Sequence, residues 1–162
     1  MRILGIDPGL AIVGWSVVDF DKKGNHSAVD FGAILTKKDM SVGERLQEIY
    51  DDLNHIVDKF KPDCCGLETL LFYNNARTAM VVGEARGIVR LVLQRANIPV
   101  YEFTPLQVKS SISGYGRAPK KQVQENVKLF FNLDEIPKPD DVADALALAV
   151  ACFDRLKMDR FL

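Results

Sequence analysis

The amino-acid sequence predicts an α/β protein with a five-stranded mixed sheet flanked by helices on both faces. Three observations support this class. The first 35 residues contain three apolar, strand-like runs joined by short turns, which is typical of antiparallel hairpins. The spacing of apolar residues then changes to a helical period. Two later short apolar runs are separated by a long helical segment, which makes their pairing parallel with a right-handed crossover.

Five segments have the pattern of strands. The residues at 21–25 (DKKGN) supply a hairpin turn between the second and third segments. The fourth segment is short and bounded, as expected of a buried strand, and it ends in Glu68. The expected strands are residues 2–7, 12–20, 27–35, 63–68 and 99–103.

Helix signals follow the strands. Ser41 and Glu44 form an S-x-x-E capping box before a run of apolar residues at helical spacing, and Lys61-Pro62 ends that run. Thr104-Pro105 starts another helix, because Thr is a good N-cap and Pro fits the first turn. The expected helices are residues 42–60, 75–96, a helix from 105 to the Gly-containing break at 113–118, 119–131 and 140–157.

Length and composition predict one domain covering residues 1–162, with an ordinary balance of apolar and charged residues. No apolar run reaches the ~18 residues of a membrane span. The chain opens with a strand pattern rather than a signal peptide. The three cysteines lack a C-x-x-C spacing, and we expect them to be buried thiols. These features favour a cytoplasmic protein. With only two histidines, hydrolytic chemistry would have to use carboxylates.

Charge is distributed unevenly along the second half of the chain. Residues 104–131 carry five basic side chains and one acidic one, whereas residues 134–144 carry five acidic side chains and one basic one. A basic stretch beside an acidic one suits a phosphate-binding surface around a cation site. Charge alone supports equally well two solvated faces of opposite sign.

Three acids, Asp7, Glu68 and Asp144, stand in apolar surroundings, and Asp141 lies close to the last of them. Asp7 and Glu68 each end a predicted core strand, at the edge where open α/β sheets build their sites. Asp141 and Asp144 share one face of a helix, just before the apolar run ALALAVA. Taken singly, each acid has a structural explanation as a turn acceptor or a helix cap.

Taken together, the four acids favour a metal site. Several buried anions near one edge repel one another unless protons or cations compensate them. A set of oxygen ligands suits Mg²⁺ or Mn²⁺, and paired ions about 4 Å apart serve in-line phosphoryl displacement.

Five motifs occur in order along nearly the whole chain: GIDPG at 5–9, LETLLFYNNARTAMVVGEARG at 67–87, VK at 108–109, APKKQVQ at 118–124 and DVADALALAV at 141–150. In this arrangement the chain resembles the RuvC family of bacterial Holliday-junction resolvases. The resemblance implies an RNase H-like fold, a homodimer, and paired symmetric nicks that leave 5′-phosphate and 3′-hydroxyl ends. It also implies the branch-migration proteins RuvA and RuvB as partners.

The resemblance assigns roles to particular residues. Asp7, Glu68, Asp141 and Asp144 match the family's catalytic acids and would hold Mg²⁺, two ions per subunit, with Mn²⁺ as a substitute. Lys109 and Lys120 match family lysines that would hold the scissile phosphate or stabilise developing charge. The residues expected to contact DNA are Phe72, Tyr73, Arg77, Lys109, Arg117, Lys120 and Lys121.

One position departs from the family pattern. Members commonly carry an aromatic wedge just after the second acid, and the ungapped match to that position is Leu71. Phe72 is our candidate wedge, because exposed aromatic side chains stack on splayed bases. Phe72 as a core anchor remains an equal alternative. Arg77 similarly suits either a phosphate contact or a solvated helix surface.

The long helix at 75–96 carries more apolar surface than one stripe needs, and Gly83 and Gly87 would allow another element to approach. Burial against both the sheet and a second subunit would explain this pattern. The alternative is a helix enclosed within the monomer.

Other functions remain as hypotheses. A nuclease of the YqgF type would share the fold but act on RNA or other branched substrates. An actin-like or sugar-kinase-type ATPase shares the G-I-D-x-G hairpin but needs two domains, for which 162 residues are too few. A catalytically silent junction-binding protein is disfavoured by the intact set of acids.

Overall fold

The computed structural model describes residues 1–69 and 76–159. For residues 76–78 it describes the backbone and not the side chains. The described elements confirm the predicted order of strands and helices, with boundaries that differ by no more than about two residues. The strands are β1 (Arg2–Asp7), β2 (Ile12–Phe20), β3 (His26–Leu35), β4 (Cys64–Glu68) and β5 (Val100–Phe103). The helices are α1 (Val42–Phe60), α2 (Ala76–Arg95), α3 (Pro105–Ser113), α4 (Lys120–Phe130) and α5 (Asp140–Asp159).

The five described strands form one mixed sheet in the order β3-β2-β1-β4-β5. The first three strands pair antiparallel, as predicted, while β4 pairs parallel with both β1 and β5. The strand order therefore places β1 at the centre of the sheet, beside β4. This arrangement brings the carboxyl ends of β1 and β4 to the same edge.

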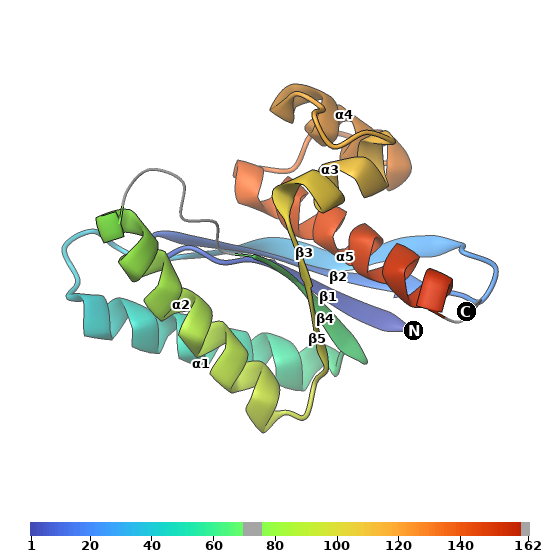
Figure 1. The fold of residues 1–162 in the computed structure, drawn as a ribbon. Coiled ribbons are helices and arrows are strands. Elements are labelled where there is room, and N and C mark those ends of the chain that lie inside the picture. Colours follow the sequence, from blue (N-terminus) through green and yellow to red (C-terminus); the bar gives the residue numbers. More distant parts are fainter. Residues whose placement is uncertain (70–75, 160–162) are drawn as a thin grey trace.

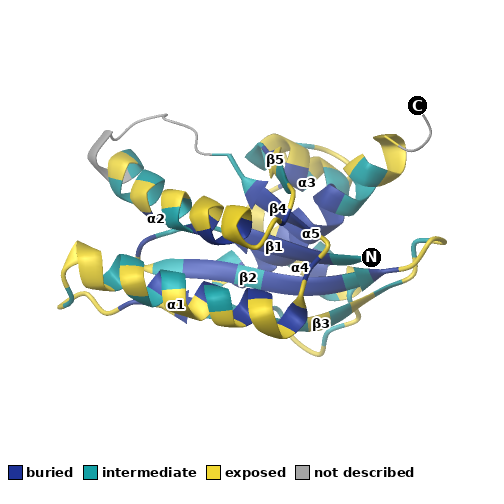
Figure 2. Cartoon of the chain, turned by 90° about the horizontal axis from the view of Figure 1, so that it is seen from below, coloured by how far each residue is buried: buried dark blue, intermediate teal, exposed yellow. Residues whose placement is uncertain are grey.

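Helices cover both faces of this sheet (Figure 1). The helices α1 and α2 lie on one face, while α5 crosses the other face with α3 and α4 stacked beyond it. Each face has its own apolar core, and Figure 2 shows the buried sheet between helices whose outer sides are exposed. No helix among the described residues has the length and hydropathy needed to cross a bilayer.

The predicted helix caps are present. The Ser41 side chain accepts a hydrogen bond from the Glu44 amide and the Glu44 carboxylate accepts one from the Ser41 amide, which completes the capping box of α1. Thr104 and Gln107 form the same reciprocal pair at the start of α3, where Pro105 occupies the first turn. These local signals are sufficient to start both helices because each satisfies backbone donors that have no partner within the helix.

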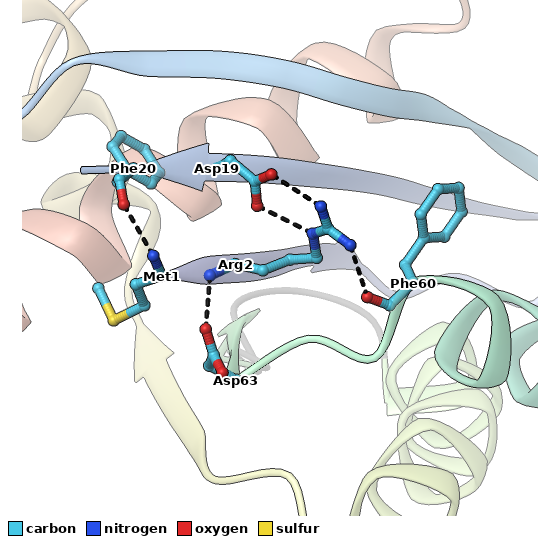
Figure 3. A network of polar contacts seen from close by, with 6 residues as sticks. All are labelled: Met1, Arg2, Asp19, Phe20, Phe60 and Asp63. Atoms are coloured by element: carbon cyan, nitrogen blue, oxygen red, sulfur yellow. Dashed lines mark hydrogen bonds and ion pairs between the residues drawn. The ribbon is translucent and has the colours of Figure 1, made fainter.

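Polar contacts hold the amino-terminal end of β1, opposite the acidic edge (Figure 3). The Arg2 guanidinium pairs with Asp19 on β2 through two bonds of 2.9 and 2.7 Å and donates to the Phe60 carbonyl at 3.0 Å. The Arg2 amide donates to Asp63 at 2.6 Å, just before β4. This network ties β1 to β2 and to the segment leading into β4, so the central strand is anchored far from the acids.

Candidate active site

Asp7 and Glu68 end two neighbouring parallel strands. The register pairs Gly5 of β1 with Gly66 of β4, so each acid lies two residues beyond a paired glycine. Side chains alternate between the faces of a sheet, and each acid therefore shares a face with the glycine that precedes it. That face is the one covered by α5.

Glycines allow α5 to approach this face closely. A Cβ atom added to Gly14 on β2 would lie 2.0 Å from the carbonyl oxygen of Asp141, and one added to Gly5 would lie 2.0 Å from that of Ala145. At Gly66 the added atom would meet the α5 backbone at 2.7 Å. The helix therefore crosses β2, β1 and β4 in direct backbone contact, where larger side chains would hold it away.

The first turns of α5 carry the other two acids to this edge. Asp141 and Asp144 are three residues apart and so lie on one face of the helix. The buried hydroxyl of Ser16 on β2 donates to the Ala145 carbonyl at 2.9 Å and fixes this part of the helix on the sheet. Glu68 and Asp144 line one cavity, and the charges of Asp141 and Asp144 both act on Asp7, so the four predicted acids lie at this edge of the sheet.

The surroundings of Asp7 disfavour its charged form. Burial, followed by the charges of Glu68, Asp144 and Asp141, raises the pKa of Asp7 to about 9, and protonated Asp7 shares a hydrogen bond with Glu68. Burial also raises the pKa of Glu68 and of Asp144, although the nearby lysines oppose both shifts. The protein without a bound cation therefore keeps a proton among these acids at neutral pH.

This donor set fits a hard divalent cation. Four carboxylates offer only oxygen ligands, and their mutual repulsion is the kind that a cation relieves. In the described part of the chain, no three acidic, His or Cys side chains are already arranged as an ion-coordinating group. The carboxylates would thus have to release the proton and turn toward the ion as it binds.

The shared proton predicts an unusual dependence of stability on pH. The pKa of Asp7 rises from 3.8 to about 9, so between these values the folded state holds a proton that the unfolded state has lost. The unfolding free energy of the metal-free protein should therefore decrease as the pH rises through this window, by up to about 1.4 kcal/mol per pH unit for one proton. Urea unfolding in a chelating buffer at several pH values measures the slope, and Asp7→Asn should flatten it. An equal slope in both proteins would contradict the assignment to Asp7.

Lysines from α3 and α4 face the acids. Lys109 and Lys120 line a cavity of about 120 Å³ together with Glu68 and Asp144. The Lys120 ammonium lies 3.1 Å from Asp140 and 3.8 Å from Asp144. Desolvation acts to lower the pKa of Lys120, but the hydrogen bond to Asp140 and the charge of Asp144 outweigh it and raise that pKa. Lys120 therefore stays charged beside the acidic cluster, where an anionic group can reach it.

The remaining predicted DNA contacts differ in how far the structure places them. Arg117 is exposed in the break before α4, and Lys121 is exposed on the first turn of α4. Phe72 and Tyr73 lie outside the described residues. The backbone of Arg77 belongs to the first turn of α2, and its side chain is not among those that the structure describes.

The helix α2 buries one face and exposes another. Ala85, Val89 and Val92 are fully buried in the core shared with α1, while Met80 and Leu91 are 69% and 48% exposed. The three cysteines are buried free thiols, as predicted.

Two features of the site were not predicted from the sequence. The glycines that admit α5 were overlooked, although both core strands have the same Gly-x-acid spacing, in GID and in GLE. Arg86 belongs to the GEARG motif but received no role. Its guanidinium Nε donates to the main-chain oxygen of Glu68 at 3.2 Å, and only the tertiary structure shows this contact.

Comparison with known proteins identifies the family. The family model described as crossover junction endodeoxyribonuclease RuvC matches residues 3–152, which is nearly the whole chain. The chain belongs to the RuvC family. The RuvC of Thermotoga petrophila is 53% identical over 150 residues, covering 92% of this chain and 90% of that protein. The RuvC of Fusobacterium nucleatum is 47% identical over 156 residues, covering 96% of this chain and 82% of that protein.

Solved structures agree with the RuvC assignment. Thermus thermophilus RuvC superimposes with a TM-score of 0.89 at 32% identity, covering 98% of this chain and 97% of that one. The T. thermophilus RuvC in complex with a Holliday junction substrate gives a TM-score of 0.92 at 31% identity, covering 98% and 96% of the two chains. The yeast mitochondrial Holliday junction resolvase Ydc2 shares the fold alone, with a TM-score of 0.60 at 15% identity.

Proposed function

We propose that this chain resolves four-way DNA junctions by paired symmetric nicks, in DNA recombination and repair. The observation that carries the proposal is the meeting of Asp7, Glu68, Asp141 and Asp144 at one edge of the sheet, in a RuvC-family chain. The high structural similarity to a RuvC bound to a Holliday junction supports the choice of substrate. A YqgF-type nuclease would share the fold, but the family model and the curated relatives favour RuvC.

The four acids are proposed to hold divalent metal ions, with Mg²⁺ as the ion and two per subunit, as the family resemblance implies. When bound, such ions lower the pKa of the attacking water and stabilise the leaving 3′ oxygen, which gives 5′-phosphate and 3′-hydroxyl ends. Asp7 and Glu68 share a proton without the metal, so binding must release it. Metal affinity should therefore increase with pH.

The basic side chains are proposed to hold the DNA. Lys109 and Lys120 line the cavity beside Glu68 and Asp144, where a phosphate could lie between the ammonium groups and the acidic edge. Positive charge there favours the charge that develops on the phosphate during hydrolysis. The proposed outer contacts are Arg117, Lys121, Arg77, Tyr73 and Phe72, with Phe72 as the candidate wedge.

A homodimer is proposed because two symmetric nicks need two active sites on one junction. The exposed Met80 and Leu91 on α2 support an additional apolar contact beyond the monomer core. Gly87 supports the same idea, because a Cβ placed there would meet nothing within 4 Å in this chain. RuvA and RuvB remain proposed partners on family resemblance.

Junction cleavage tests the function directly. The purified protein, a synthetic four-way junction with labelled strands and Mg²⁺ should yield nicks at symmetric positions in two opposed strands, with ends that a ligase can seal. A linear duplex of the same sequence is the matched substrate control. Equal cutting of the duplex, or cutting of an RNA-containing substrate in preference to the junction, would contradict the proposal.

A further inference from the structure

The backbone pairing of β4 with β1 stops just before Glu68. The ladder between β1 and β4 ends at the pair Ile6–Leu67, one residue before Glu68. On the other side, Glu68 is in register with Phe103, and the Thr69 amide donates to the Phe103 carbonyl at 2.8 Å. The backbone at Glu68 is therefore held by β5 on one side. On the other side it forms no backbone pair with β1.

Arg86 reaches this end of β4 from α2. Its guanidinium Nε donates to the main-chain oxygen of Glu68 at 3.2 Å, and its Nη2 lies 2.8 Å from Oε1 of Glu102 on β5. One planar guanidinium therefore bridges the backbone of one strand and the side chain of the next. Its rigid fork of donors makes such a bridge directional, which a lysine ammonium could not reproduce.

Glu102 in turn is held by two arginines one helical turn apart. Arg90 also pairs with Oε1 of Glu102, but the Arg90 side chain is 53% exposed, whereas that of Arg86 is 15% exposed. Exposed ion pairs contribute little to stability. The more buried Arg86 is also the arginine that contacts the main chain of Glu68. The two arginines are therefore not equivalent, although both belong to α2 and both contact the same carboxylate.

We propose that Arg86 is a positioning residue for Glu68, and that Glu102 orients Arg86. The inference rests on the proposed function in one respect, since it takes Glu68 to be a metal ligand. Arg86 touches neither the acid's carboxylate nor the cavity; it fixes the main chain from which the carboxylate projects. Partners of this kind that orient a ligand affect metal affinity and activity about 10- to 100-fold when removed.

Metal binding tests this role without relying on cleavage. Mn²⁺ alone is titrated calorimetrically into wild type, Arg86→Met, Glu102→Gln and the matched control Arg95→Met, an exposed arginine on the same helix. Arg86→Met should raise the Mn²⁺ dissociation constant about tenfold or more, and Glu102→Gln should raise it by a smaller factor. Arg95→Met should match wild type.

Two further measurements separate positioning from a general structural role. Junction binding without metal should stay within about twofold of wild type in Arg86→Met, and its lowered kcat should recover as Mn²⁺ is raised, because only ligand placement is impaired. Mn²⁺ affinity in folded Arg86→Met equal to that of Arg95→Met would overturn the proposal. If Arg86→Met does not fold, unchanged affinity in Glu102→Gln overturns it. A wild type that binds Mn²⁺ but cuts no junction would instead overturn the proposed function.

Discussion

Asp7→Asn should abolish junction cleavage while leaving the protein folded and able to bind the junction without metal. Asp7 ends the central strand, and the other three acids act on it electrostatically, so we propose it as the ligand around which the site is assembled. Metal ions contribute several kcal/mol of transition-state stabilisation. Losing the metal should therefore reduce the cleavage rate about a thousandfold or more. Single-turnover cleavage of a labelled junction measures the rate, and gel retardation in a chelating buffer measures binding.

The control for Asp7 is Asp52→Asn, the same substitution at an exposed position on α1. It should cut at the wild-type rate. In Asp7→Asn, the loss of an acid that is costly to ionise should also stabilise the metal-free protein above neutral pH. Residual cleavage near the wild-type rate would remove Asp7 from the catalytic set, and lost binding together with lost stability would indicate a folding role.

Gly14→Ala should impair both stability and cleavage, although Gly14 carries no chemistry. The added Cβ would lie 2.0 Å from the Asp141 carbonyl oxygen, which forces the first turn of α5 away from β2. Overpacking of this kind lowers the unfolding free energy by about 1–3 kcal/mol or more. A displacement of about 1 Å at a catalytic group reduces rate about a hundredfold. Denaturant unfolding and single-turnover cleavage measure the two effects.

Gly43→Ala is the matched control for this substitution. Gly43 lies in the first turn of α1, and a Cβ atom there would meet nothing within 4 Å. The control should be as stable as wild type or more so, because Ala favours a helix over Gly by about 0.5–1 kcal/mol. A Gly14→Ala protein with wild-type stability and rate would show that α5 does not need this close approach.

The local pattern was sufficient for the secondary structure and for selecting the candidate acids. Alternating or continuous apolar runs identified the strands, and the S-x-x-E and Thr-Pro signals marked where α1 and α3 begin. Asp7 and Glu68 stood out because a carboxylate at the end of an apolar strand needs compensation. Such signals lie within a few residues of one another, so they can be recognised without knowledge of the fold.

Contacts between distant segments could not be recognised in the same way. The raised pKa of Asp7 depends in part on the charges of Asp141 and Asp144, which are more than a hundred residues away in the sequence. Arg86 contacts the backbone oxygen of Glu68, and backbone oxygens have no signature in the amino-acid sequence. The GEARG motif marked the place of Arg86 but contained no information about its partner.

The sequence alone thus determined which side chains are proposed to carry the chemistry, because residue type and spacing indicate candidate ligands, caps and core positions. The tertiary structure decided how near those side chains come to one another. Gly5, Gly14 and Gly66 belong to three separate strands, and only the register of the sheet aligns them under α5. That close backbone packing places two acids of a helix over two acids of the sheet. The physical reason is steric: a helix can approach a sheet only where the side chains between them are absent.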